Sequence, residues 1–471
     1  MKLEANQHFG ITQVLRLGLV QACLGGLVVL MTSTLNRVMV VELALPALLP
    51  GVLVALHYAV QLSRPRMGWG SDVGGRRTPW IVGGMAVLAA GALLASASVA
   101  WMETQRAAGV ALAFVAFVLI GLGVAACGTT LLVLLAKRVR AERRAASATT
   151  VWVMMIFGFA VTAGTAGRFL DPYSPGRLMA VTGVVAAIAM GLTLLATWRL
   201  EGPAVADTPA APAAEHGASA FGTALREVWA DPPARRFTLF IFVSMLAFSA
   251  QDLILEPFAG SLFGFTPGRS TQLSGVQHGG VLLGMLAAAL AGSRWRGRQF
   301  GSLSGWTAGG CVASGIALAG LVLAAARGPG YPLEANVFVL GVANGAFSVA
   351  AIGSMMRLAG EGPPAREGVR IGLWGAAQAV AFALGGLVGT GASDLAHRLL
   401  PSPAMAYAAV FGAEALLFLV AAWLAFRPLP GNRPQRPGSG RRRPLAGRSG
   451  LSGADRLQPG ALDHAVWRVV Q

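Results

Sequence analysis

Long apolar runs separated by short polar segments dominate the hydrophobic pattern of the chain. A transmembrane helix needs about 20 successive, mostly apolar residues, with a range of about 17–25. The predicted spans are residues 15–36, 46–62, 79–100, 108–135, 150–168, 177–198, 236–257, 272–291, 302–326, 334–358, 369–391 and 404–426. This pattern predicts an all-α, polytopic membrane protein with 12 transmembrane helices.

A polar, proline-rich stretch at residues 199–234 separates the first six spans from the last six. Within it, Phe221–Trp229 predicts a short amphipathic helix. We predict four regions: an N-terminal six-helix half (1–198), a cytoplasmic linker (199–235), a C-terminal six-helix half (236–427) and a disordered basic tail (428–471). Transporters built from two such repeats move one half against the other around a central site.

Composition excludes a water-soluble protein of this size. Only 12% of the 471 residues are charged and 55% are hydrophobic, whereas soluble domains carry about 25% charged residues. The three cysteines all lie inside apolar runs, which favours small buried hydrophobes over disulfides or metal ligands. Residues 1–13 are polar and no cleavage site follows the first run, so we expect that run to be a retained span.

Arginine and lysine are unevenly divided between the two sides of the predicted membrane. Loops on the side of the termini carry 19 of these residues and loops on the other side carry seven. The seven are Arg37, Arg106, Arg168, Arg177, Arg269, Arg327 and Arg398. The positive-inside rule therefore predicts cytoplasmic termini. For Arg441–Arg443 in the tail, attraction to anionic lipid headgroups is favoured over nucleic-acid binding.

The loop between spans two and three fits the pattern G-x-x-x-D-x-x-G-R-R. Its defining residues are Gly68, Asp72, Gly75, Arg76 and Arg77. The pattern resembles the cytoplasmic loop motif of the major facilitator superfamily. The glycines permit a tight turn, and we expect the charged side chains to pair with charges and helix ends across this surface. The corresponding loop of the second half, Gly292–Arg298, keeps glycines and arginines but has no acid.

Two further segments, Thr34–Leu43 and Gln251–Gly260, resemble signature stretches of the PucC/LhaA family, also called the bacteriochlorophyll delivery family. These are major-facilitator-like proteins of photosynthetic bacteria. The resemblance covers roughly residues 10–427, and the second-to-third-span loop departs from PucC itself. That departure favours a branch labelled as a bacteriochlorophyll synthase subunit. The family resemblance implies a role in handling bacteriochlorophyll while antenna complexes are assembled.

The same resemblance places spans one and seven at equivalent positions beside the central axis. It implies a polar cluster between the halves, made of Asn36, Arg37, Glu42, Gln251, Asp252 and Glu256. Asp252 and Glu256 are four residues apart and share one helical face. We predict an ion pair of Arg37 with Glu256 or Asp252 that joins the halves on the outer side. The alternatives are acids that only cap helix ends and, with less weight, a transporter's proton relay.

A pigment such as bacteriochlorophyll, bound or transiently carried, needs an axial ligand for its magnesium, and neutral histidine is the expected donor. Only His278 and His57 lie in predicted spans. A lone histidine in a span is more often an interhelical hydrogen bonder than a ligand. Asn344, Gln378, Glu42 or a water molecule are alternative oxygen ligands.

Enzyme signatures are missing from the sequence. It contains no P-loop, dinucleotide fingerprint, metal-ligand cluster or Asp-rich diphosphate motif, so we expect a non-catalytic protein. Three functions remain: a pigment-delivering assembly factor, a small-molecule transporter, and an accessory subunit of late bacteriochlorophyll synthesis. The expected partners are the lipid bilayer, light-harvesting or reaction-centre polypeptides and pigment-synthesis enzymes, with no nucleic acid. The expected location is the bacterial inner (intracytoplasmic) membrane.

Overall fold

The computed structural model describes residues 8–64, 67, 76–140, 143–201, 226, 229–292, 302–360 and 367–426. Gly68, Asp72 and Gly75 of the loop motif lie outside these ranges, as do the loop 293–298 and the tail 428–471. Only Arg226 and Trp229 of the predicted amphipathic helix are described.

Every regular secondary-structure element in the described ranges is a helix. Its long helices are α1 (Ile11–Val29), α3 (Leu48–Val60), α5 (Thr78–Met102), α6 (Arg106–Arg138), α7 (Arg144–Leu170), α8 (Pro175–Thr197), α10 (Pro232–Phe263), α11 (Pro267–Gly292), α12 (Leu303–Arg327), α13 (Leu333–Gly360), α14 (Glu367–Leu399) and α15 (Pro403–Phe426). Within the described ranges, 11 helices are long and apolar enough to span a membrane, and Leu48–Ser63 is a shorter apolar helix. Each coincides with one predicted span, which confirms the all-α polytopic fold.

The first helix extends beyond the predicted end at residue 36. It continues from α1 through two π-helical turns, η1 (Leu30–Thr34) and η2 (Val38–Glu42), which flank the short helix α2 (Leu35–Arg37). The predicted span ended at residue 36, just before the charged side chain of Arg37. Instead Arg37 is buried, and the protein supplies its polar partners.

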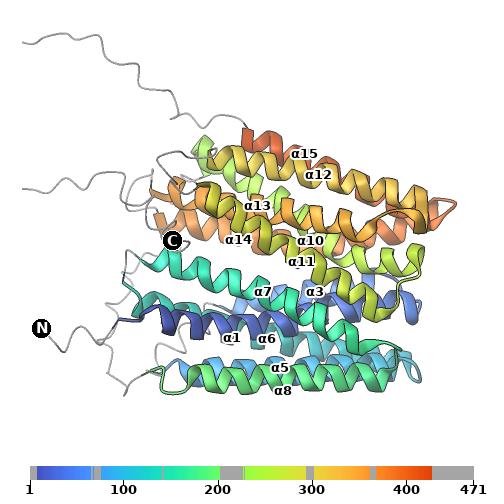
Figure 1. The fold of residues 1–471 in the computed structure, drawn as a ribbon, viewed down its shortest axis with the longest axis horizontal. Coiled ribbons are helices and arrows are strands. Elements are labelled where there is room, and N and C mark those ends of the chain that lie inside the picture. The colour runs from blue at the N-terminus through green and yellow to red at the C-terminus, as the bar shows by residue number, and fades with distance from the viewer. Residues whose placement is uncertain are drawn as a thin grey trace, which may run out of the picture.

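The two halves repeat one packing scheme, seen in Figure 1 as two groups of helices, α1–α8 and α10–α15. In the first half α1 contacts α7 and α8, α5 contacts α6 and α8, and α3 contacts α6. Each contact has a counterpart in the second half, where α10, α12 and α11 replace α1, α5 and α3. This repetition makes α7 the equivalent of α14, and α3 the equivalent of α11.

Each half has its own apolar core. One buried cluster draws on residues 14–200, with Leu253 as its only member from the second half, and the other draws on residues 237–422. A third, smaller cluster joins α7 to α11 and α13 through Ile156, Val281 and Ala346. Most contact between the halves runs along two helix pairs, α7 with α11 and α3 with α14, and the end of the first helix also touches α10 and α11.

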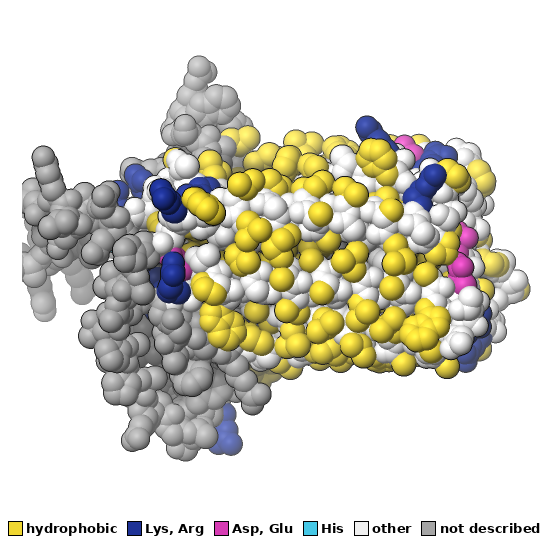
Figure 2. Space-filling model, turned by 90° about the horizontal axis from the view of Figure 1, so that it is seen from below, with side chains coloured by type: hydrophobic (Ala, Val, Ile, Leu, Met, Phe, Trp, Pro, Cys, Tyr) yellow, Lys and Arg dark blue, Asp and Glu magenta, His cyan; other side chains and the backbone are white. Residues whose placement is uncertain are grey.

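The outer surface suits a bilayer. Apolar side chains cover the middle of the face in Figure 2, and the visible charged side chains lie towards its two ends. The protein is therefore a multi-pass membrane protein. Below, the proximal end is the end at which α1 begins and α15 ends, and the distal end is the opposite one (Figure 1).

Candidate functional site: the polar contact between the two halves

At the distal end, an aspartate of the first half binds the start of a helix in the second half. Asp171 follows the last residue of α7. Its Oδ2 accepts a hydrogen bond from the Thr266 hydroxyl (2.6 Å), and its Oδ1 accepts one from the Gly268 amide (3.1 Å). A carboxylate is favourable here because the first amides of α11 have no partner within the helix.

A second aspartate makes the reciprocal contact. Asp394, near the end of α14, accepts hydrogen bonds from the amides of Ala47 (2.9 Å) and Leu48 (2.8 Å) at the start of α3. Since α14 is the equivalent of α7 and α3 is the equivalent of α11, the pseudo-twofold relation carries one contact onto the other. Each half therefore caps a helix of its partner, and we call Asp171 and Asp394 the reciprocal caps.

Asn36 and Arg37 make the next contacts towards the centre. The Asn36 amide donates to the Leu253 carbonyl, and Nη2 of Arg37 donates to the Phe265 carbonyl (2.6 Å). A Cβ placed on Gly260 would lie 3.0 Å from Nε and from Nη2 of Arg37. Both side chains thus join the halves through backbone carbonyls of the second half.

The predicted ion pair between the halves is replaced by one within the first half. Arg37 pairs with Glu42, five residues further along the same helix. The wide π-helical turn Val38–Glu42 explains this choice, because a wider turn brings residues i and i+5 to the same face. In a regular α-helical turn, residues five apart do not share a face.

Tyr173 lies in the loop between α7 and α8, near this ion pair. Burial raises the pKa of Tyr173 to about 12, and the carboxylates of Glu103 and Glu42 add to the rise while Arg37 opposes it. The Tyr173 hydroxyl therefore stays protonated at neutral pH.

Asp252 and Glu256 share one helical face, as their spacing of four residues predicted, and the structure turns that face to α11. Asp252 accepts a hydrogen bond from the amide of Gln277 (3.1 Å). Fully buried Glu256 accepts from the hydroxyls of Ser270 (3.2 Å) and Ser274 (2.6 Å). The contacts available to Glu256 are thus neutral hydroxyls rather than the Arg37 guanidinium.

Hydroxyl pairs extend this network across the halves. Ser33 and Ser274 lie 3.1 Å apart through their Oγ atoms, and Thr34 and Thr271 lie 2.9 Å apart through their Oγ1 atoms. Ser274 contacts Ser33 and also donates to Glu256. We call these residues, with Asn36, Arg37, Asp252, Glu256, Ser270 and Gln277, the inter-half network.

Two buried polar side chains nearby have no hydrogen-bond partner among the described residues. They are Gln251, through both amide atoms, and Glu414, through both carboxyl oxygens. Each is at most 3% exposed. A buried polar group without a partner costs about 1–3 kcal/mol, so these two side chains lower the stability of the fold.

The two candidate histidines have different surroundings. Nδ1 of His278 donates a hydrogen bond to the Ser274 carbonyl (2.8 Å), and no other hydrogen bond to the ring occurs in the described part of the chain. The ring packs edge-on against Phe159 of α7, with centroids 5.0 Å apart. In this tautomer Nε2 carries no proton, and its lone pair is available to coordinate a metal ion. Histidines that bind metals have the same arrangement.

His57 is less suited to bind a ligand. It is 2% exposed, and its Nε2 lies 2.8 Å from the side-chain nitrogen of Gln61 one turn away. Two of the alternative oxygen ligands are engaged, since Asn344 accepts from Ser314 (2.8 Å) and Glu42 pairs with Arg37. Gln378 donates weakly to the Met245 sulfur at 3.9 Å.

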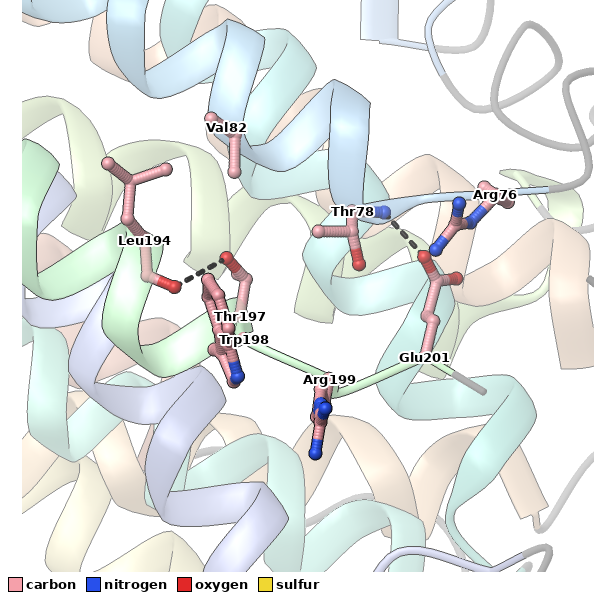
Figure 3. Close-up of a pocket in the computed structure, with 8 residues that line it drawn as sticks. All are labelled: Arg76, Thr78, Val82, Leu194, Thr197, Trp198, Arg199 and Glu201. Carbon is pink, nitrogen blue, oxygen red and sulfur yellow. Dashed lines mark hydrogen bonds between the residues drawn. The ribbon is translucent and has the colours of Figure 1, made fainter. Parts of the chain in front are cut away.

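The described part of the loop motif lies at the proximal end, away from the inter-half network. Glu201, just after α8, accepts hydrogen bonds from the amides of Arg77 (2.8 and 3.0 Å) and Thr78 (2.6 Å). Backbone amides of the motif thus meet an acid at the start of α5, and the predicted pairing of its charged side chains stays a prediction. Beside these residues a cleft of about 610 Å³ opens between α5 and α8 (Figure 3).

Metal-binding clusters are not found in the described ranges: no group of three or more His, Cys, Asp or Glu side chains converges there. Cys127 and Cys311 are buried and Cys23 is half-buried, and all three are unpaired. They serve as small apolar side chains, as predicted.

Comparison with known proteins shows the family. The model of the PUCC protein family matches residues 34–430. The chain belongs to the PucC family. It is 55% identical to the bacteriochlorophyll synthase 44.5 kDa chain of Rhodobacter capsulatus, covering 88% of this chain and 95% of that protein, and 30% identical to protein PucC of the same species, covering 88% and 92%. The resemblance seen in Thr34–Leu43 and Gln251–Gly260 is therefore confirmed.

Solved structures confirm the major facilitator fold for this member of the PucC family. A peptide transporter POT in complex with sulfate superposes with a TM-score of 0.64 at 16% identity, covering 89% of this chain and 95% of that one. The nucleoside transporter NupG superposes with a TM-score of 0.63 at 14% identity, covering 88% and 99%. At these identities the likeness concerns the fold alone.

Sequence reasoning missed most partners in the inter-half network of this PucC family member. Ser33, Thr34, Ser270, Thr271 and Ser274 lie in or beside apolar runs, where hydroxyl residues are common and uninformative. The reciprocal caps had a weak signal, since Asp171 precedes Pro172 in a turn and Asp394 is an acid within the last third of a predominantly apolar helix. Only the pseudo-twofold relation reveals that the two aspartates are equivalent.

Double-mutant cycles should distinguish the observed ion pair from the predicted one. We expect Arg37→Gln and Glu42→Gln to be coupled by about 1–2 kcal/mol, within the range for contacting residues. The coupling between Arg37→Gln and Glu256→Gln should be clearly smaller, because no hydrogen bond joins these two side chains. Unfolding by SDS titration of the purified protein measures both cycles. Equal coupling in the two cycles would restore the prediction of an ion pair between the halves.

Proposed function

We propose that the protein is a membrane assembly factor that receives or delivers bacteriochlorophyll while light-harvesting or reaction-centre polypeptides are assembled in a phototrophic bacterium. The observation that carries this proposal is 55% identity to a protein named as a bacteriochlorophyll synthase chain, over 95% of that protein's length. Membership of the PucC family supports the same role.

The role we propose is non-catalytic. A prenyl-transferring synthase would need carboxylates grouped to hold a magnesium diphosphate. Asp252 and Glu256 instead accept hydrogen bonds from Gln277, Ser270 and Ser274. The two aspartates at the distal end bind helix amides. We therefore propose that this chain accompanies a synthase as a non-catalytic subunit, which would account for the word synthase in the relative's name.

His278 is the residue we propose for holding the pigment. Its unprotonated Nε2 has the chemistry of an axial magnesium ligand, and the Ser274 carbonyl fixes the ring orientation through Nδ1. The His278 ring lies at the contact of α7 with α11, beside Phe159. The pigment itself supplies the light-absorbing group, and the protein supplies the ligand and an apolar, water-poor setting.

Membership of the PucC family supports a location in the bacterial inner, intracytoplasmic membrane. The arginine asymmetry supports an orientation with both termini in the cytoplasm. The proximal end would then face the cytoplasm and the reciprocal caps would face the periplasm.

A small-molecule transporter is the second candidate function. The buried carboxyl groups of Glu256 and Glu414 favour it, because acids inside membranes often mark ion pathways.

Gentle purification tests the proposal. The tagged full-length protein, extracted from phototrophic membranes, should carry bacteriochlorophyll and antenna or reaction-centre polypeptides, identified by absorbance and mass spectrometry. His278→Phe should lower the bound pigment at least several-fold, while His57→Phe, the matched control, should leave it unchanged. Purified protein with neither pigment nor photosynthetic polypeptides would overturn the assembly role. Equal pigment in His278→Phe would remove His278 as the ligand.

A further inference from the structure

The cleft between α5 and α8 lies outside the inter-half network and has a different character. Its base is apolar, formed by Val82 and Leu194, and its rim carries Arg76 and Arg199 (Figure 3). Trp198 lies at the end of α8 with 69% of its surface exposed. An apolar groove with cationic groups and an indole at its mouth matches an amphiphile with an anionic head.

The positions of the two arginines are fixed by the ends of both helices. Arg199 has a left-handed backbone (φ 51°), which is unfavourable for a residue with a Cβ. The turn it makes brings Glu201 back to the amides of Arg77 and Thr78. Because Glu201 already caps α5, its charge is directed into the helix end, and the helix amides are not available to an external anion.

A third arginine adds positive charge on the other side of α8. Nε of Arg16, in α1, donates to the Ala196 carbonyl (2.8 Å), and its Nη2 donates to the Trp198 carbonyl. These bonds hold the last turn of α8 beside the cleft. Arg76 and Arg199 thus line the cleft with two positive charges, Arg16 adds a third behind α8, and Glu201 is an acid of the lining.

The apolar base continues into the lipid-facing stripe of α8. Leu194 and Leu195 are 48% and 70% exposed, and Ile188 and Val184, further along the helix, are also exposed. A free inorganic anion would make no apolar contact with this stripe, whereas an acyl chain would cover it. The site lies at the proximal end, at the level where a span meets the headgroup region.

We propose that this cleft binds an anionic phospholipid, with its phosphate between Arg76 and Arg199 and an acyl chain along Val82, Leu194 and the exposed face of α8. The lipid would link the start of α5 to the end of α8, and so to the chain segment that leaves the first half. This site is independent of pigment binding and of the proposed function.

Native mass spectrometry of delipidated, full-length protein tests the site. We expect phosphatidylglycerol to bind more tightly than phosphatidylcholine, and Arg76→Gln with Arg199→Gln to weaken phosphatidylglycerol binding by about 30-fold, the effect of losing two cationic contacts to lipid. Arg76→Lys with Arg199→Lys keeps both charges and should retain most of the binding.

Two controls make the test decisive. Arg235→Gln with Arg236→Gln removes two arginines at the proximal start of α10 in the other half, and it should leave tight phosphatidylglycerol binding intact. Inorganic phosphate at the same concentration should not compete with the lipid. An equal loss in this control variant, equal binding of phosphatidylcholine, or full competition by phosphate would each overturn the proposal.

Discussion

Replacing Gly345 with valine should prevent the C-terminal half from folding. In α11 and α13, the pairs Gly280–Gly284 and Gly341–Gly345 face each other at a four-residue spacing. A Cβ on Gly345 would lie 2.0 Å from the Val281 carbonyl oxygen, and a Cβ on Gly284 would lie 2.0 Å from the Val342 carbonyl oxygen. Small residues at such spacing allow two helix backbones to approach closely in a membrane.

We expect a large loss of stability because backbone atoms, rather than a flexible side chain, occupy the space that the valine side chain would need. Overpacking costs about 1–3 kcal/mol where neighbours can shift, and α11 also carries the contacts to α7 and the inter-half network. We expect Gly345→Val to abolish monodisperse protein in size-exclusion chromatography after detergent extraction, with a strong drop in the membrane-inserted amount.

The matched control lies on α11 itself. Gly279 precedes Gly280, but a Cβ there would meet no atom within 4 Å. Gly279→Ala should therefore leave yield and thermal stability within a few degrees of the parent protein. Similar behaviour of Gly279→Ala and Gly345→Val, whether both are tolerated or both are lost, would contradict the backbone-contact argument.

Removing the reciprocal caps should open the distal end. In Asp171→Asn with Asp394→Asn, each side chain loses its charge and one of its two accepting oxygens. Hydrogen bonds to charged groups contribute about 1.5–3 kcal/mol, and an amide keeps part of that. We expect the two changes together to weaken the distal contact by about 3 kcal/mol, which corresponds to roughly 100-fold in an equilibrium between closed and open arrangements.

Spin-label distances across the distal end measure this effect. Thr104 and Arg327 lie in or beside the distal turns of the two halves, and cysteines placed there can be labelled once the three native cysteines are replaced. The double variant should show a longer distance population that the parent lacks. Glu334→Gln is the control, because Glu334 pairs with Arg269 at 3.2 Å within the second half. An unchanged distribution in the double variant would show that the caps do not hold the halves together.

Much of the fold could be predicted because a bilayer imposes a simple rule. Each span must bury about 20 apolar residues and satisfy its own backbone, so the helices can be recognised from hydropathy alone. The rule failed at the end of the first helix, where Arg37 is buried rather than solvated. There, polar atoms from Glu42 and Phe265 replace water.

The candidate site was only partly predictable. Sequence signatures identified Asn36, Arg37, Asp252 and Glu256, and the structure brings all four to the contact between the halves. Their partners could not be predicted. A spacing of four residues shows that two carboxyl groups share a helical face, but it does not show which helix packs against that face. The hydroxyl donors come from α11, at positions separated from Glu256 by a turn whose geometry the sequence does not specify.

The sequence by itself determined the spans, the division into two halves, the family and the polar residues that the spans tolerate. These properties follow from local composition and from motifs that are read along one segment. Only the tertiary structure decided which groups bind each other: Arg37 with Glu42, Glu256 with Ser270 and Ser274, and the reciprocal caps with opposite helix ends. These pairings depend on helix register and on the pseudo-twofold packing of the halves, which arise only when distant segments meet.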